Sequence, residues 1–315
     1  MTLIFSPAPH IHRRRDTRRS MLHVIVALTP AVLTALWYFG MPALVTLAVC
    51  LAACVGSEWL IARYVMGRRG ALPSLSAAIT GILLALNLPA DLPWWTAVIG
   101  SLFAIAVVKM AFGGLGCNVF NPALAGRVFL LLSFPALMTV WPEAGGGFHA
   151  APDGVTGATT LELLKYGGTI PDTLDLLTGH MGGSMGETGA VAILIGLAYM
   201  LCVGIISWHI PVAILATVAV FCALIGQPVL VNLLSGGLLL GAVFMATDYV
   251  TSPMTRRGML VYGVLIGVIT VIIRRWGAYP EGMSFAILLG NATVPLIDRC
   301  IRPRMYSPRR KEAAA

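Results

Sequence analysis

Long apolar runs separated by short polar breaks make up most of this chain. Each run is close to the ~20 residues that a helix needs to cross ~30 Å of hydrocarbon. The runs lie at about 21–40, 42–66, 73–89, 94–112 and 123–141, and then at about 188–206, 209–226, 229–247, 258–275 and 282–301. Because lipid cannot satisfy backbone polar groups, spanning segments of this kind must be helical. The pattern therefore predicts an all-α polytopic membrane protein with about ten transmembrane helices.

Composition supports a membrane protein and excludes several other classes. The chain has 315 residues, of which 58% are hydrophobic and 11% are charged, and its mean hydropathy is +0.86. Its net charge of +8 does not form a basic face with interleaved aromatics, so we expect no nucleic-acid partner. The cysteines are scattered, mostly inside apolar runs, where they are typical of small buried hydrophobes, and we expect no metal site.

The basic residues orient the predicted helices. With the N-terminus on the cytoplasmic side, all but three of the 21 Lys and Arg residues fall on that side, the exceptions being Lys165, Arg274 and Arg275. The positive-inside rule favours this arrangement. We predict a cytoplasmic tail at 1–20, a first membrane half at 21–142, an external loop at 143–187, a second half at 188–301 and a cytoplasmic tail at 302–315. No cleavable signal peptide is expected.

Three breaks rich in Gly, Asn and Pro interrupt the apolar runs, at 112–127, 244–258 and 279–299. They are ordinary connecting loops or unwound helices that line a cavity, and the second interpretation is favoured for the first two breaks. Glycines allow close backbone approach, and amides suit the edge of a flavin ring. Helix packing by small residues is the alternative. The candidate cavity residues are Gly113, Gly114, Gly116, Asn118, Asn121 and Asn291.

Three acids lie inside or at the end of apolar runs, namely Glu58, Asp248 and Asp298. An ionised acid at mid-membrane costs roughly 2.5–3.5 kcal/mol, so such a residue usually faces protein or water and has a role. We interpret these three as a candidate ion path. The alternative is a set of interfacial pairs with nearby arginines, although Glu58 has only Arg63 close to it in sequence.

A faint internal repeat links the two halves. The stretch 75–86, LSAAITGILLAL, resembles 233–244, LLSGGLLLGAVF. With five helices in each half, such a repeat would be inverted in the membrane, as in many transporter folds.

The polar interruption contains the stretch 153–160, DGVTGATT. A Gly-rich turn capped by Thr would explain T-G-A-T alone. The longer pattern of Asp153, Thr156, Gly157, Ala158 and Thr159 resembles a flavinylation motif, in which the last hydroxyl carries FMN through a phosphoester bond. The resemblance implies that Thr159 is the attachment residue. It also implies that Asp153 presents the motif to the attaching enzyme and that Thr156 braces the loop. Thr160 stands where Pro often follows the motif.

Several stretches together resemble one family, the D subunits of Rnf-type ion-translocating oxidoreductases that link ferredoxin and NAD. The B subunit of the sodium-pumping NADH:quinone reductase is a close relative with a longer N-terminal extension. This chain starts almost directly at SPAPHI, which favours the Rnf subunit. The matching stretches lie at 6–31, 113–135, 153–161, 182–196, 244–258 and 279–306.

The resemblance implies a function that composition does not give. Such subunits carry electrons in a six-subunit complex of the bacterial inner membrane that moves Na⁺ or H⁺. They hold one covalent FMN, attached outside the cytoplasm by a flavin transferase, and a second noncovalent flavin, either riboflavin or FMN. Their fold resembles that of urea and ammonium channels, with two inverted five-helix repeats.

The chain carries neither a Rossmann glycine pattern nor a P-loop, so we expect no NAD or ATP site on it. The subunit of the quinone reductase and a cofactor-free channel or secondary transporter are the alternatives. A covalent flavin would discriminate the redox subunit from the channel.

Overall fold

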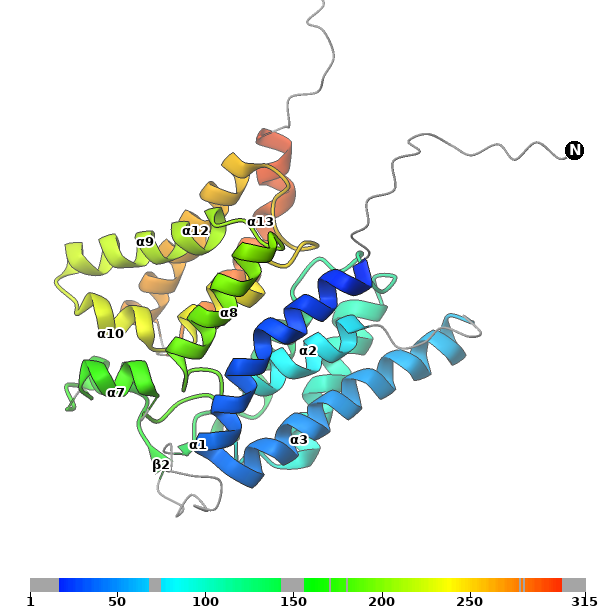
Figure 1. Ribbon diagram of the computed structural model, residues 1–315, viewed down its shortest axis with the longest axis horizontal. Coiled ribbons are helices and arrows are strands. Elements are labelled where there is room, and N and C mark those ends of the chain that lie inside the picture. The colour runs from blue at the N-terminus through cyan, green and yellow to red at the C-terminus, as the bar shows by residue number, and fades with distance from the viewer. Residues whose placement is uncertain are drawn as a thin grey trace, which may run out of the picture.

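The structure is a computed structural model that describes residues 17–67, 75–142, 156–169, 171–179, 181–277, 279 and 281–301. The described chain is mostly helical (Figure 1). Asp153, most of the predicted N-terminal tail, the predicted C-terminal tail and the first part of the predicted external loop lie outside the described residues.

The first half begins with one long, kinked helix. Helix α1 (Thr17–Leu60) has non-helical backbone at Gly40, where it turns back on itself (Figure 1). The kink separates the runs predicted at 21–40 and 42–66. The other elements of this half are η1 (Ile61–Val65), α2 (Leu75–Leu86), α3 (Trp94–Leu102), η2 (Phe103–Met110), α4 (Pro122–Ser133) and α5 (Pro135–Met138), where η denotes π-helical turns.

A short connecting region precedes the second half. Strands β1 (Trp141–Pro142) and β2 (Thr156–Gly157) form an antiparallel pair, followed by α6 (Thr160–Tyr166) and α7 (Thr173–Thr178). The second half then contains α8 (Ala190–Val203), α9 (His209–Ile225), α10 (Val229–Leu234), α11 (Leu238–Leu240), η3 (Gly241–Met245), α12 (Arg256–Trp276) and α13 (Met283–Cys300).

Most helices are shorter than the sequence predicts. By length and composition, Thr17–Val65 and Arg256–Trp276 could cross a membrane, whereas five further apolar helices within the described ranges have 10–17 residues. The helices are shorter because backbone breaks fall inside the predicted runs. The run predicted at 229–247, for example, is interrupted between α10 and α11, where Gly236 and Gly237 have positive φ.

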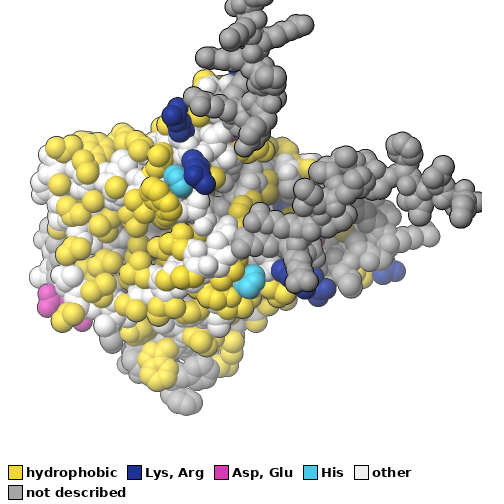
Figure 2. All heavy atoms as spheres, turned by 45° about the horizontal axis from the view of Figure 1, so that its top comes forward, with side chains coloured by type: hydrophobic (Ala, Val, Ile, Leu, Met, Phe, Trp, Pro, Cys, Tyr) yellow, Lys and Arg dark blue, Asp and Glu magenta, His cyan; other side chains and the backbone are white. Residues whose placement is uncertain are grey.

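The two ends of the molecule differ. The start of α1 and the ends of α8 and α13 lie at one end, and β2 and α7 lie at the other (Figure 1). Hydrophobic side chains are spread over the face shown in Figure 2. Exposed Arg18, Arg19, Arg256, Arg257 and Arg299 all belong to the end where α1 begins. This separation agrees with the charge asymmetry that the sequence predicts.

One apolar core runs through both halves. It includes Phe39 and Leu84 from the first half and Ile193, Phe244 and Ile287 from the second. The halves are therefore packed together, and the breaks between their helices lie against one another. A cavity lies where the two breaks meet.

Candidate functional site: a cavity at one end and a threonine motif at the other

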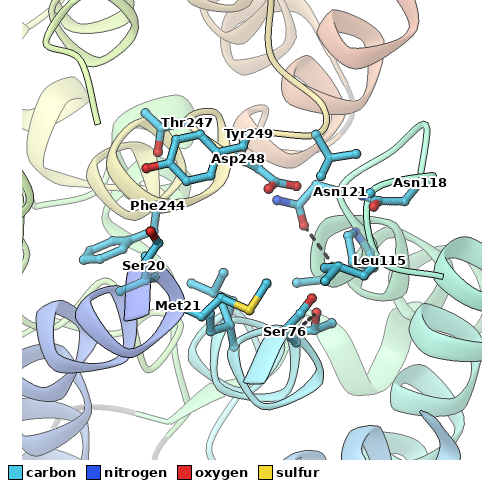
Figure 3. A pocket seen from close by; sticks show the side chains of 18 of the residues that line it. Ser20, Met21, Ser76, Leu115, Asn118, Asn121, Phe244, Thr247, Asp248 and Tyr249 are labelled. Atoms are coloured by element: carbon cyan, nitrogen blue, oxygen red, sulfur yellow. Dashed lines mark hydrogen bonds between the residues drawn. The ribbon is translucent and has the colours of Figure 1, made fainter. Parts of the chain in front are cut away.

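A cavity of about 500 Å³ lies near the end where α1 begins. This volume is in the range of ligand and cofactor sites. The start of α1, α2, the end of α8 and the breaks after η2 and η3 form its wall. Met21, Leu115 and Phe244 supply apolar surface, and Asn118, Asn121 and Asp248 bring polar groups (Figure 3). We call it the main cavity.

The glycines of the first break divide between two roles, ending η2 and lining the main cavity. Gly113 and Gly114 terminate η2, since their N–H groups donate to the carbonyls of Met110 (3.0 Å) and Lys109 (3.1 Å). Gly116 lines the main cavity. All three glycines have positive φ, a conformation that a side chain would strain. Of the glycines predicted to line a cavity, the structure thus places Gly116 there and uses Gly113 and Gly114 for the turn.

Asn121 joins the two breaks at the cavity wall. Its Oδ1 accepts from the N–H groups of Ala123 (3.0 Å) and Leu124 (3.4 Å), which caps the start of α4. Its Nδ2 donates to the carbonyl of Met245 (3.2 Å) in η3. Asn118 lines the same wall and donates to the carbonyl of Phe120 (3.1 Å). Both residues predicted from the first break therefore lie at the cavity.

Asn291 does not line the main cavity. It is 1% exposed. In the amide orientation that satisfies its partners, its oxygen accepts from the Asn121 N–H (3.0 Å). Its nitrogen then donates to the Tyr262 hydroxyl (2.7 Å) and the Thr251 carbonyl (3.2 Å). Asn291 therefore fastens α13 to both breaks, a structural role that differs from the predicted one.

Glu58 has a buried partner that the sequence did not indicate. Its Oε2 lies 2.7 Å from Nζ of Lys109, which is 1% exposed. Arg63, the expected neighbour, lies over the rings of Trp59 and Tyr64. Lys109 is 51 positions away in sequence, so only the packing of α1 against η2 brings the two charges together.

The other two acids occupy different surroundings. Asp248 lines the main cavity, and its Oδ2 accepts from the Thr251 hydroxyl (3.5 Å). Asp298 accepts from the N–H of Met254 (3.2 Å) at an exposed position. The structure thus brings Glu58 and Asp248 to one region around Lys109 and leaves Asp298 elsewhere. Their role in ion movement stays a prediction.

The threonine motif lies at the opposite end of the molecule. Thr159 is the N-cap of α6, and its Oγ1 accepts from the N–H of Glu162 (3.2 Å). Thr159 is 2% exposed, and the neighbouring Thr160 hydroxyl points to Sδ of Met181 (3.6 Å). Gly157 is half-buried and Ala158 is exposed. The two adjacent hydroxyls therefore differ in direction, with Thr159 at the helix start.

Four further buried charges do not line the main cavity. Arg127 pairs with Glu281 and donates to Asn87 Oδ1 (3.2 Å) and Ser284 Oγ (2.9 Å). Glu187 accepts from the Ser184 hydroxyl (2.8 Å) and the Gly236 N–H (3.2 Å). Arg274 donates to the carbonyls of Asn232 (2.5 Å) and Ser235 (2.9 Å).

The charge pattern of the sequence placed Lys109, Arg127 and Arg274 at the membrane surfaces as orientation signals. All three are buried. The signal that could have identified them is a charged residue within or at the edge of an apolar run. Within the described ranges, no group of three His, Cys, Asp or Glu side chains could hold a metal ion.

Comparison with known proteins identifies the family. The model of the NQR2, RnfD, RnfE family matches residues 4–307. The D subunit of the Na⁺-translocating ferredoxin:NAD⁺ oxidoreductase complex of Acetobacterium woodii is 47% identical over an alignment of 321 positions. The alignment covers 100% of this chain and 99% of that protein. The D subunit of an ion-translocating oxidoreductase complex from Stutzerimonas stutzeri is 42% identical, with 93% of each chain covered. The protein of that name from Escherichia fergusonii is 36% identical, covering 98% of this chain and 100% of its own. The predicted resemblance is confirmed, and the chain belongs to the NQR2, RnfD, RnfE family.

Proposed function

We propose that this chain is the D subunit of an Rnf-type ion-translocating oxidoreductase complex linking ferredoxin and NAD. In this proposal it carries electrons on a covalent FMN at Thr159 and on a second, noncovalent flavin in the main cavity. Full-length similarity to proteins named as D subunits supports the assignment over the quinone reductase subunit. The other subunits of the complex and a flavin transferase are its partners.

The observation that carries the proposal is the placement of two different flavin-compatible features at opposite ends of one membrane protein. The flavinylation motif ends at Thr159, beside β2 and α6. The main cavity lies at the end where α1 begins. The flavin rings supply the redox chemistry, and the protein positions them and sets their electrostatic surroundings. Two carriers at the two ends suit electron transfer across the membrane part of the complex.

The residues around the main cavity fit a flavin ring. The apolar side chains of Met21, Leu115 and Phe244 suit the ring faces, and Asn118 supplies a polar group for its edge. The Asn121 amide uses both its oxygen and its nitrogen, in capping α4 and in donating to Met245, whereas the Asn118 amide donates through its nitrogen to the Phe120 carbonyl. Asn118 is therefore the better candidate to contact the ring, and Asn121 to shape the wall.

Covalent attachment at Thr159 requires a local rearrangement. Its hydroxyl is buried and accepts the Glu162 N–H. The hydroxyl must become accessible to the attaching enzyme, either before α6 packs or by opening of its first turn. A helix of seven residues with this cap is short enough for such opening.

A denaturing gel under ultraviolet light tests the covalent flavin. The chain without substitutions should give a fluorescent band. Thr159→Ala should abolish the fluorescence while the protein stays in the membrane. Thr160→Ala is the matched control and should keep the band, because its hydroxyl is directed at Met181. A fluorescent Thr159→Ala protein would show that another residue carries the flavin. If the chain without substitutions carries no flavin, a cofactor-free channel or transporter is favoured.

A further inference from the structure

The wall of the main cavity carries a buried ammonium group. Lys109, near the end of η2, lines the cavity and is 1% exposed. Glu58 Oε2 lies 2.7 Å from its Nζ, and Asp248 is close enough to interact with it electrostatically. Among the described residues that line the cavity, Lys109 and Asp248 are the charged ones. Glu58 lies behind Lys109 and does not line the cavity.

Stability alone is a weak reason for such a pair. Replacing a buried ion pair by apolar residues of similar volume is often neutral or stabilising, because desolvation offsets the attraction between the charges. Ionisable side chains in membrane segments usually mark a functional site. Lys109 lies within a run that is otherwise apolar, FAIAVVKM. Because Lys109 lines the cavity, its charge can interact with a molecule bound there.

We propose that Lys109 is a cofactor-binding residue whose ammonium favours the reduced, anionic form of the flavin in the main cavity. This inference rests on the proposed noncovalent flavin. Uptake of two electrons and one proton leaves one net negative charge on the ring system. A positive charge at the cavity wall stabilises that charge, and charges near the ring nitrogens are a recognised means of tuning flavins. Glu58 holds the ammonium in place and partly neutralises it.

The arrangement predicts opposite signs for substitutions at neighbouring positions. Lys109→Met removes the positive charge and should lower the midpoint potential of the flavin. Glu58→Gln leaves the ammonium less neutralised and should raise the potential. Asp248→Asn removes a negative charge from the wall and should also raise it. If the substitutions only loosened the cavity, the direction of the shift in midpoint potential would not follow the sign of the charge removed.

The test uses the full-length chain carrying Thr159→Ala, purified in detergent and supplied with riboflavin, so that the noncovalent ring is the one titrated. Bound riboflavin is measured first. The ring is then reduced stepwise with dithionite, which supplies the electrons, at fixed pH, with water supplying the proton. Lys109→Met should weaken binding of the reduced ring relative to the oxidised ring by about tenfold or more, which corresponds to a fall of about 30 mV for a two-electron couple.

Two further variants keep the result interpretable. Lys109→Arg preserves the charge and should keep the potential near that of the parent chain. If Lys109→Met does not accumulate because the buried Glu58 carboxylate loses the ammonium, the double variant Lys109→Met with Glu58→Gln removes both charges. It should still lower the potential, since Lys109 lines the cavity and Glu58 does not.

The outcomes separate this inference from the proposed function. Bound riboflavin with an unchanged potential in Lys109→Met overturns the role of Lys109 and leaves the flavin cavity standing. Shifts of Lys109→Met and Glu58→Gln in the same direction also overturn it. A parent chain that binds no riboflavin contradicts the flavin cavity itself, and the role of Lys109 with it.

Discussion

Two adjacent arginines at the end of α12 have opposite surroundings. Arg274 is 6% exposed, and its guanidinium donates to the carbonyls at the end of α10, where it also faces Glu187. Arg275 is exposed. The sequence placed both on the outer surface, because a charge count cannot tell which member of such a pair faces the core. The helix phase and the carbonyls freed at the α10–α11 break determine it.

Arg274→Ala should therefore destabilise the protein far more than Arg275→Ala. The change leaves the buried carbonyls of Asn232 and Ser235 without the guanidinium that donates to them, and an unsatisfied buried acceptor typically costs about 1–3 kcal/mol. The check is the temperature at which the detergent-solubilised protein loses its single size-exclusion peak. We expect a clear fall for Arg274→Ala and none for Arg275→Ala. Equal stability of the two variants would contradict the buried role of Arg274.

At the scale of elements, the segment 183–190 shows where prediction from sequence stops. Its Gly-rich, polar composition favours a loop, and the sequence assigned it as far as residue 187 to the external region. In the structure every residue of the segment is buried. The N–H of Gly186 donates to the carbonyl of Leu86 (2.6 Å), which ends α2. The insertion depends on unpaired backbone groups at the end of α2, which lie 100 positions away.

Gly186→Ala should disrupt this insertion. A Cβ there would lie 2.7 Å from Leu240 Cδ2 and 2.9 Å from the carbonyl oxygen of Leu86. Overpacking of this kind costs typically about 1–3 kcal/mol. Gly56→Ala in α1 is the matched control, because a Cβ there meets nothing within 4 Å and alanine favours the helix. The midpoint of heat-induced aggregation in detergent should fall for Gly186→Ala and stay level or rise for Gly56→Ala.

At the scale of the whole molecule, the order of the apolar runs was predictable and the site was only partly so. The run predicted at 209–226 is α9, and the one predicted at 258–275 is α12. Hydrophobic length reports such elements directly. Glu58 pairs with Lys109, and Asn291 holds α13 instead of lining the cavity. Both depend on contacts between distant segments, which a single sequence does not encode locally.

Orientation in the membrane is a prediction at this same scale. Exposed arginines gather at the end where α1 begins, so that end should face the cytoplasm and the α6–α7 end should face outward. The exposed cysteines Cys117, Cys202 and Cys300 belong to the first end, and exposed Thr169 belongs to the second. A membrane-impermeant maleimide should therefore label Thr169→Cys in intact cells and leave the unmodified chain unlabelled. Permeabilised cells provide the control, since the natural cysteines should then react. Labelling of the natural cysteines in intact cells, with Thr169→Cys protected, would reverse the orientation and put the proposed FMN site on the cytoplasmic side.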